Sequence, residues 1–289
     1  MINKQIVAQA LDQLEGLMML VETYETIAGT SVRRIRHSTL TNREFHVGLN
    51  QMYQEIMHAY KKEIEQLMKE KKITSEHMML NQHTKKTVLM LLSANTGLYG
   101  DVLHRTFTAF ITELKRTEGD IAIIGRMGKI FFEEMMPGKE FTYFDFPDNT
   151  VSLEHLKRVS AFLGAYEKVV VFYAVFKNLL IQQVQASIIS GTELPAEEIQ
   201  NKTLQPYFFE PSLEKVTLFF EKEIFASLLE QVFQESRLAK LASRMVLLDR
   251  AVSNIELALK HVSVQKQQVY HRVTNRQLLN SLSGMALWK

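Results

Sequence analysis

The apolar side chains near the end of the chain recur every three to four residues over a long stretch without helix breakers. Residues 212–283 contain neither glycine nor proline, so nothing in their composition interrupts an α-helix. Starting at Leu238, alternating steps of three and four residues reach apolar side chains at ten of eleven positions. The eleven positions are Leu238, Leu241, Met245, Leu248, Val252, Ile255, Leu259, Val262, Lys266, Val269 and Val273. This spacing predicts a long helix that forms one strand of a coiled coil.

The beginning of the chain carries a less regular version of the same pattern. Residues 1–96 contain no proline. Steps of three and four residues from Leu14 reach a second apolar stripe, which comprises Leu14, Leu17, Val21, Tyr24, Ala28, Ser31 and Ile35. A long helix with a single apolar stripe is only marginally stable alone. We therefore expect the two terminal helices to pair as an antiparallel coiled coil.

The middle of the chain alternates between short, almost continuously apolar runs and helical patterns. All five prolines lie between residues 137 and 211. The predicted strands are 86–93, 120–125, 141–146, 169–173 and 185–189, and the predicted helices are 98–117, 126–135 and 151–165. Apolar strands that alternate with helices favour a sheet covered by helices.

These patterns together predict a mixed α+β and α/β fold with three segments. An N-terminal coiled-coil helix is expected over 1–72, a central Rossmann-like α/β domain over 73–206, and a C-terminal coiled-coil helix over 207–289.

The composition excludes several classes of protein. The chain has 289 residues, with 34 Lys and Arg against 32 Asp and Glu, so its net charge is only +2. A dedicated nucleic-acid-binding domain is usually strongly basic, and we expect no nucleic-acid partner. Cysteine is absent, which removes disulfides and zinc–thiolate sites and is typical of a cytosolic protein. No run approaches the roughly 20 apolar residues of a membrane span.

The glycine motifs do not match known nucleotide-binding loops. Gly97-Leu98-Tyr99-Gly100 follows the first predicted strand but lacks the spacing of a dinucleotide-binding loop. Gly125-Arg126-Met127-Gly128 follows the second strand and lacks the form of a phosphate-binding loop. Both are better interpreted as strand-to-helix turns. The nine histidines show no zinc-binding spacing, so we expect no catalytic residues, no metal and no cofactor. A nucleotide-dependent enzyme built on the central domain remains an alternative.

A basic run lies on the first predicted helix. Arg33, Arg34 and Arg36 follow a stretch in which one lysine is accompanied by four acidic residues. The simplest interpretation is a solvated helix face. The alternative is an electrostatic contact with an acidic partner surface.

Several segments, in order along the chain, resemble the gamma subunit of F-type ATP synthases. They are Tyr24–Arg34, Ser93–Gly100, Gly125–Gly128, Tyr207–Pro211, Glu235–Ser236, Ala242–Met245, Asp249–Ala251 and Leu278–Leu287. The resemblance covers about nine-tenths of the chain, and it implies the architecture that the hydrophobic pattern predicts.

The resemblance implies a non-catalytic rotor in the central stalk, which couples rotation of an ion-conducting ring to ATP synthesis or hydrolysis. The implied partners are the alpha and beta subunits of the hexamer, an epsilon-type subunit and the membrane c-ring, at the cytoplasmic face of a membrane. The implied hexamer contacts are Tyr24, Glu25, Arg33, Arg34, Arg36, Tyr270, His271, Asn275 and Gln277. The implied foot on the ring contains Tyr207 and Glu210.

Two departures from the family pattern change this picture. The first helix is acidic before Arg33, where the family is usually lysine-rich. In the last helix, Tyr270-His271 replaces an Arg-Gln pair, while Asn275 and Gln277 replace Thr and Glu. Hydrogen-bonding capacity survives there, but charge does not. The departures suggest a divergent paralogue that serves an alternative, sodium-type ATPase. A coiled-coil scaffold or adaptor with an inserted α/β domain is the rival hypothesis.

Overall fold

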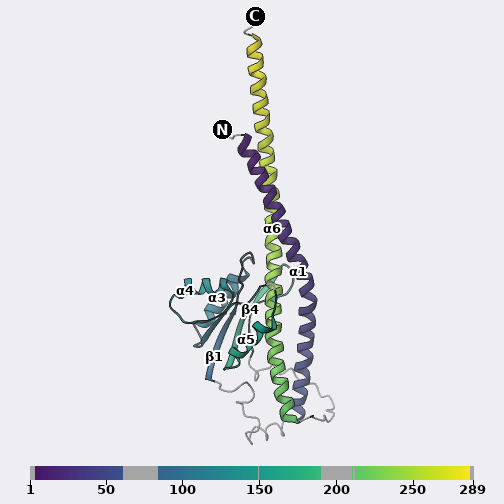
Figure 1. Cartoon of the computed structure of the whole chain (residues 1–289), viewed down its shortest axis with the longest axis vertical. Helices are drawn as coiled ribbons and strands as arrows, with labels where there is room; N and C mark the ends of the chain where they lie inside the picture. The colour runs from purple at the N-terminus through teal and green to yellow at the C-terminus, as the bar shows by residue number, and fades with distance from the viewer. Residues whose placement is uncertain (1–3, 61–83, 149, 190–209, 211, 287–289) are drawn as a thin grey trace. The chain divides into compact units, whose positions relative to one another are not determined.

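The computed structural model describes residues 4–60, 84–148, 150–189, 210 and 212–286 (Figure 1). The chain divides into two compact units, and two long helices contribute to both. The first unit is Met1–Thr30 with Arg244–Lys289, and the second is Ser31–Ser243. The long helices are α1 (Lys4–Ala59) and α6 (Leu213–Ala286). The predicted boundaries at 72/73 and 206/207 lie outside the described residues, so the three-segment division stays a prediction.

In the first unit, α1 and α6 pair in antiparallel directions along the predicted seam of α6 (Figure 1). Leu248, Ile255 and Val269 are buried there. The other seam positions from Met245 to Val262 are half-buried, whereas Asp249 and Asn254 on the outward faces are exposed. The predicted coiled coil is therefore confirmed, and its seam on α6 follows heptad spacing.

The seam ends earlier than the sequence pattern predicted. Val269 is buried, but Val273 is exposed. From Tyr270 to Ser283, the side chains of α6 are exposed with the exception of the half-buried Thr274. The last four turns of the described helix therefore lie beyond the paired section of the first unit.

The predicted stripe on α1 was wrong at two of its seven positions. Leu14, Val21, Ala28 and Ile35 lie on the sheltered face, but Leu17 and Tyr24 are exposed. The sheltered positions instead follow steps of four and three residues, and they are Val7, Leu11, Leu14, Met18, Val21, Glu25, Ala28, Val32, Ile35 and Thr39. The error arose because α1 carries a second apolar stripe, so apolarity alone gave two possible phases for the heptad.

The second unit contains a five-stranded sheet. Its strands are β1 (Thr84–Leu92), β2 (Asp120–Ile124), β3 (Thr142–Phe144), β4 (Tyr166–Phe176) and β5 (Gln182–Ile188), in the spatial order β3-β2-β1-β4-β5. The pairs β1–β2, β2–β3 and β1–β4 are parallel, and β5 pairs antiparallel with β4. This is the predicted Rossmann-like sheet, with an antiparallel strand added at one edge.

Helices cover both faces of the sheet, which explains why the strands read as continuous apolar runs. Helices α3 (Val102–Leu114) and α4 (Arg126–Met135) pack on one face through a cluster around Phe110 and Phe132. The other face is covered by α5 (Leu153–Leu163) and by part of α6. The α6 residues in that core are Phe225, Leu229, Val232 and Phe233.

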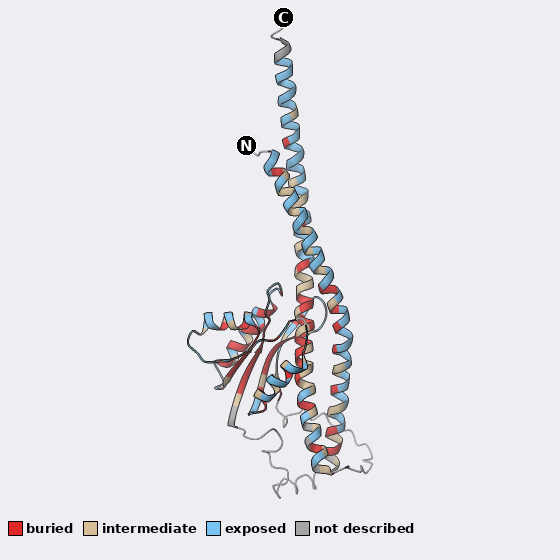
Figure 2. Cartoon of the chain, in the orientation of Figure 1, coloured by how far each residue is buried: buried red, intermediate tan, exposed pale blue. Residues whose placement is uncertain are grey.

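In the second unit, α6 also contacts α1. Val32 and Ile35 of α1 cluster with Leu238 and Leu241 of α6. The part of α6 beside the sheet therefore packs against a neighbour on two sides, and buried residues are dense along it (Figure 2).

We predict that Ile255→Asp destabilises the paired helices. Ile255 is 7% exposed, and an unpaired carboxylate on the seam should cost about 3 kcal/mol of unfolding free energy. Asn254→Asp adds the same charge at an exposed position next to it and should change stability by no more than about 0.5 kcal/mol. Urea unfolding followed by circular dichroism compares the two variants. Equal stabilities would mean that Ile255 does not face α1.

Candidate functional site

Ligands of open α/β sheets bind beyond the carboxyl ends of the parallel strands, and in the second unit a polar network closes this edge. The backbone N–H of Asn95, just after β1, donates to both carboxylate oxygens of Asp148 at 3.0 Å. The backbone N–H and the hydroxyl of Thr96 each donate to Asp148 Oδ2 at 2.9 Å. The carboxylate of Asp148 thus binds the turn after β1 much as a bound anion would.

The side chain of Asn95 joins the turns that follow three neighbouring strands. Its Nδ2 donates to Asp145 Oδ1 at 2.7 Å and to the carbonyl of Phe146 at 3.1 Å. Its Oδ1 accepts the backbone N–H of Arg126 at 2.9 Å. The turns after β1, β2 and β3 are therefore held together by one amide.

Close backbone contact leaves little room for a phosphate group at this edge. Gly125 has φ 92°, and a Cβ on it would lie 2.6 Å from the backbone nitrogen of Ala94. Only glycine permits this approach. The geometry therefore agrees with the interpretation of Gly125 as a turn residue. The backbone N–H groups of Asn95 and Thr96 already bind a carboxylate of the chain itself, so the geometry disfavours the nucleotide-dependent enzyme.

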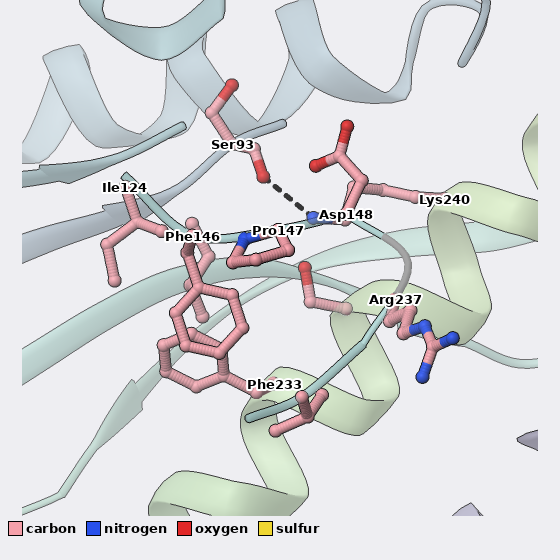
Figure 3. A pocket seen from close by; sticks show the side chains of 11 residues that line it. Ser93, Ile124, Phe146, Pro147, Asp148, Phe233, Arg237 and Lys240 are labelled. Atoms are coloured by element: carbon pink, nitrogen blue, oxygen red, sulfur yellow. Dashed lines mark hydrogen bonds between the residues drawn. The ribbon is translucent and has the colours of Figure 1, made fainter. Parts of the chain in front are cut away.

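Helix α6 lies across the same edge and donates two hydrogen bonds to it. Lys240 Nζ donates to the carbonyl of Ser93 at 2.7 Å (Figure 3). Ser243 Oγ donates to the carbonyl of Tyr99 at 2.7 Å. The turn after β1 is thus fastened to α6 at two points, one helical turn apart.

A small cavity of about 20 Å³ lies beside the Lys240–Ser93 contact (Figure 3). Its polar lining comes from Ser93, Asp148, Ser236, Arg237 and Lys240. Burial lowers the pKa of Lys240 to about 8, an effect that Asp148 opposes and Arg237 reinforces. Burial also lowers the pKa of Arg237, and the nearby Arg34 lowers it further.

Polar side chains also occupy the contact between α1 and α6 in the second unit. Arg43 binds the buried Glu235 at 2.6 Å, and Asn42 donates to Glu230 at 3.3 Å. The described neighbours give no hydrogen-bond partner to the buried His46 Nδ1, and burial lowers the pKa of His46. A polar section in a coiled-coil seam fixes the register of the two helices at some cost in stability.

Most of the proposed partner contacts are exposed. Tyr24 is 54% exposed and Tyr270 is 60% exposed. The other exposed members of the set are Arg33, Arg34, Arg36, His271, Asn275, Gln277 and Glu210. Glu25 is half-buried on the seam side of α1, and Tyr207 lies outside the described residues. No contact among the described residues assigns them to a partner, so their roles stay proposals.

The part of the chain that the structure describes has no helix that is long and apolar enough to span a membrane. Its His, Asp and Glu side chains form no group of three that could hold a metal ion.

Comparison with known proteins decides the family. The family model described as "ATP synthase" matches residues 4–285. The chain belongs to the ATP synthase gamma family. The predicted resemblance and the predicted central-stalk role are thereby confirmed.

The similarity to individual proteins extends over most of the chain, although the sequence identity is low. The chain is 22% identical over 220 residues to the ATP synthase gamma chain of Desulforudis audaxviator, covering 70% of this chain and 74% of the relative. It is 20% identical to the gamma chain of Geobacter sp. (strain M21), covering 98% of both. A chain in the central stalk/c-ring structure of Tetrahymena thermophila mitochondrial ATP synthase has the same fold, with a TM-score of 0.56 and 17% identity, covering 80% of this chain and 99% of that one.

No local pattern in the sequence marks the polar network of this gamma-family chain. Asp148 is 53 residues from Asn95, and Lys240 is 147 residues from Ser93. Neither pair has a local spacing that marks it. The one available signal was the strand order, because parallel neighbours bring the turns after β1, β2 and β3 to one edge.

We predict that neither ATP nor NAD⁺ stabilises the gamma-family chain alone. The amides that would bind a phosphate already bind Asp148, so the melting temperature should stay within about 1 °C in saturating ligand. Differential scanning fluorimetry measures this, with a known dinucleotide-binding dehydrogenase as the positive control. A shift of several degrees with either ligand would restore the enzyme hypothesis.

We also predict that Lys240 makes stability rise with pH in a low-salt buffer. The folded state loses the Lys240 proton near pH 8 and the unfolded state near 10.5, so between these values the unfolded state binds more protons. From pH 7.5 to 9.5 the unfolding free energy should gain on the order of 1–2 kcal/mol from this group. Urea unfolding of Lys240→Met should lack that gain, whereas Lys157→Met, at an exposed position, should keep it.

Proposed function

We propose that this chain is the rotor shaft of a rotary ATPase, which performs no catalysis itself and turns within a hexamer of alpha and beta subunits. The observation that carries the proposal is the paired section of α1 and α6, where α6 shelters its seam residues and exposes most of the others. The family match over residues 4–285 supports the same role. ATP would be made or hydrolysed in the beta subunits.

A shaft has to resist twisting, and the chain has three features that supply resistance. Residues 212–283 have no glycine or proline to kink the helix. Heptad packing joins α6 to α1. The contact between Arg43 and the buried Glu235 opposes sliding of one helix along the other, because a shift in register would leave Glu235 without its cation.

Helix α1 presents an exposed apolar stripe that supports contact with the hexamer. Leu17, Leu20, Tyr24 and Ile27 are spaced by three, four and three residues, and each is between 47% and 59% exposed. They lie on a different face from the sheltered stripe of α1. Exposed apolar patches of this kind mark interaction surfaces, so we propose that this stripe, with the basic residues Arg33, Arg34 and Arg36, meets the alpha and beta subunits.

The exposed end of α6 supports a second contact with the hexamer. Tyr270 and Gln277 are two turns apart, and His271 and Asn275 are one turn apart, so each pair lies in a row along the helix. These side chains can donate and accept hydrogen bonds. We propose that the end of α6 turns within the hexamer.

The remaining assignments rest on the family alone. We propose that Tyr207 and Glu210 belong to the foot on the membrane c-ring, that an epsilon-type subunit binds the stalk, and that the complex is peripheral at the cytoplasmic face of the membrane. The relative from Tetrahymena thermophila is described as part of a central stalk and c-ring, which supports this placement. The departures at Tyr270-His271 favour a divergent, alternative ATPase.

Affinity purification tests the rotor proposal. The tagged chain should elute with alpha and beta subunits and with an ATPase activity that depends on it. Elution with unrelated proteins only, and no ATPase, would favour the scaffold hypothesis instead.

The basic run gives a sharper prediction within the same assay. Replacing Arg33, Arg34 and Arg36 by Gln should weaken assembly with the hexamer by several-fold in low salt. The difference from the unmodified chain should shrink as salt screens the charges. The control replaces Lys115, Arg116 and Lys157 by Gln, which removes three exposed charges from the turn after α3 and from α5 and should leave assembly intact. Equal assembly of both triple variants would show that the basic run is a solvated face.

A further inference from the structure

Strand β5 forms an unprotected edge of the sheet. It is the last strand in the order β3-β2-β1-β4-β5, and its register with β4 runs without a bulge from Gln182 to Ile188. Proteins usually blunt such edges with charged side chains, prolines, bulges or very short strands. The opposite edge strand, β3, has only three residues. Strand β5 has seven residues and lies in a run, 178–192, that contains no charged residue and no proline.

The backbone hydrogen bonds at the two ends of the β4–β5 pair show which groups of β5 point outward. The N–H of Ile189 donates to the carbonyl of Val169 at 2.8 Å, and the N–H of Lys177 donates to the carbonyl of Ile181 at 3.3 Å. In an antiparallel pair, residues that bond to the neighbouring strand alternate with residues whose N–H and C=O point away from it. The odd-numbered residues of β5 therefore bond to β4. The outward backbone groups belong to Gln182, Val184, Ala186 and Ile188.

These outward groups are available to another chain. Among the described residues, none beyond β4 makes a hydrogen bond with the backbone of the four residues. The side chains of Ala186 and Ile188 are exposed. A row of N–H and C=O groups that repeats every two residues along an extended backbone matches the spacing of another β-strand. The edge therefore favours a polypeptide in an extended conformation as its partner.

The turn before β5 adds an apolar contact to this edge. The side-chain Oδ1 of Asn178 accepts the backbone N–H of Leu180 at 3.0 Å and that of Ile181 at 2.8 Å. Gln182 Nε2 donates to the carbonyl of Leu179 at 2.8 Å. This ordered turn holds Leu180 78% exposed, more than any other large apolar side chain that the structure describes. An apolar group on an ordered turn can bind a partner with little further loss of conformational freedom.

We propose that β5 pairs with an extended segment of another subunit, which adds a strand to the sheet and covers Leu180 at the turn. The run 178–192 offers no counter-charge, so the facing segment should carry few charges itself. The proposal goes beyond the proposed rotor role and rests on it in one respect. Because a shaft stands alone on the axis of its hexamer, the occupant is a different subunit and not a second copy of this chain.

Hydrogen exchange tests the pairing. In the full chain alone, which should sediment as a monomer, the amides of Val184, Ala186 and Ile188 should exchange without protection. In the affinity-purified complex the same amides should be protected by at least about ten-fold. Unchanged exchange in a complex that contains alpha and beta subunits would overturn the proposal and leave the rotor role standing. A chain that is already a dimer by itself, with these amides protected, would make a second copy the occupant and would also overturn it.

A proline on the edge tests the same point by mutation. Ala186→Pro removes one outward N–H and none that bonds to β4, so the melting temperature of the chain alone should stay within about 3 °C of that of Ala186→Ser. Ala186→Ser keeps the N–H and serves as the matched control. At least one subunit should be depleted several-fold from complexes purified with Ala186→Pro, and from those purified with Leu180→Ser, relative to this control. Equal subunit content in the three purifications would overturn the proposal.

Discussion

The rest of the structure depends on one constraint. A single uninterrupted helix, α6, has to pack against both the sheet and α1 in the second unit. In the second unit, α6 covers one face of the sheet through Phe225, Leu229 and Phe233, and it contacts α1 through Leu238 and Leu241. An amphipathic helix with one apolar stripe cannot do both. Helix α6 is therefore buried on two sides there, and the contacts with α1 include Glu235 and its cation from Arg43. The sheet and α6 are therefore joined through packed side chains on several turns of the helix.

The same constraint explains why the carboxyl edge of the sheet is closed. An open α/β sheet leaves this edge free for a ligand, but here α6 lies across it and Lys240 binds the carbonyl of Ser93. The turn after β1 keeps its anion-binding amides and fills them with Asp148. The Rossmann-like sheet is thus attached to α6 at its carboxyl edge, where other open α/β sheets bind their ligands.

The sequence predicted the elements well and the network hardly at all. The α6 seam from Met245 to Val262 follows directly from local spacing, because heptad periodicity is a property of neighbouring turns. The partnership of Asn95 with Asp148 depends on strand order, which local spacing does not encode. The partial burial of Lys240 could not be foreseen either, since a lysine in a helix normally indicates its solvated face.

The heptad phase of α1 was predicted wrongly, and the reason bears on the surface that this helix exposes. Two apolar stripes run along this helix, one through Val21 and Ala28 and the other through Leu17 and Tyr24. A helix that served only a two-stranded coiled coil would need the first stripe alone. The second stripe costs solubility unless something covers it, and in the first unit α6 leaves it exposed. The ambiguity that misplaced the seam has a physical cause, because α1 packs one apolar stripe against α6 and leaves a second one exposed in the first unit.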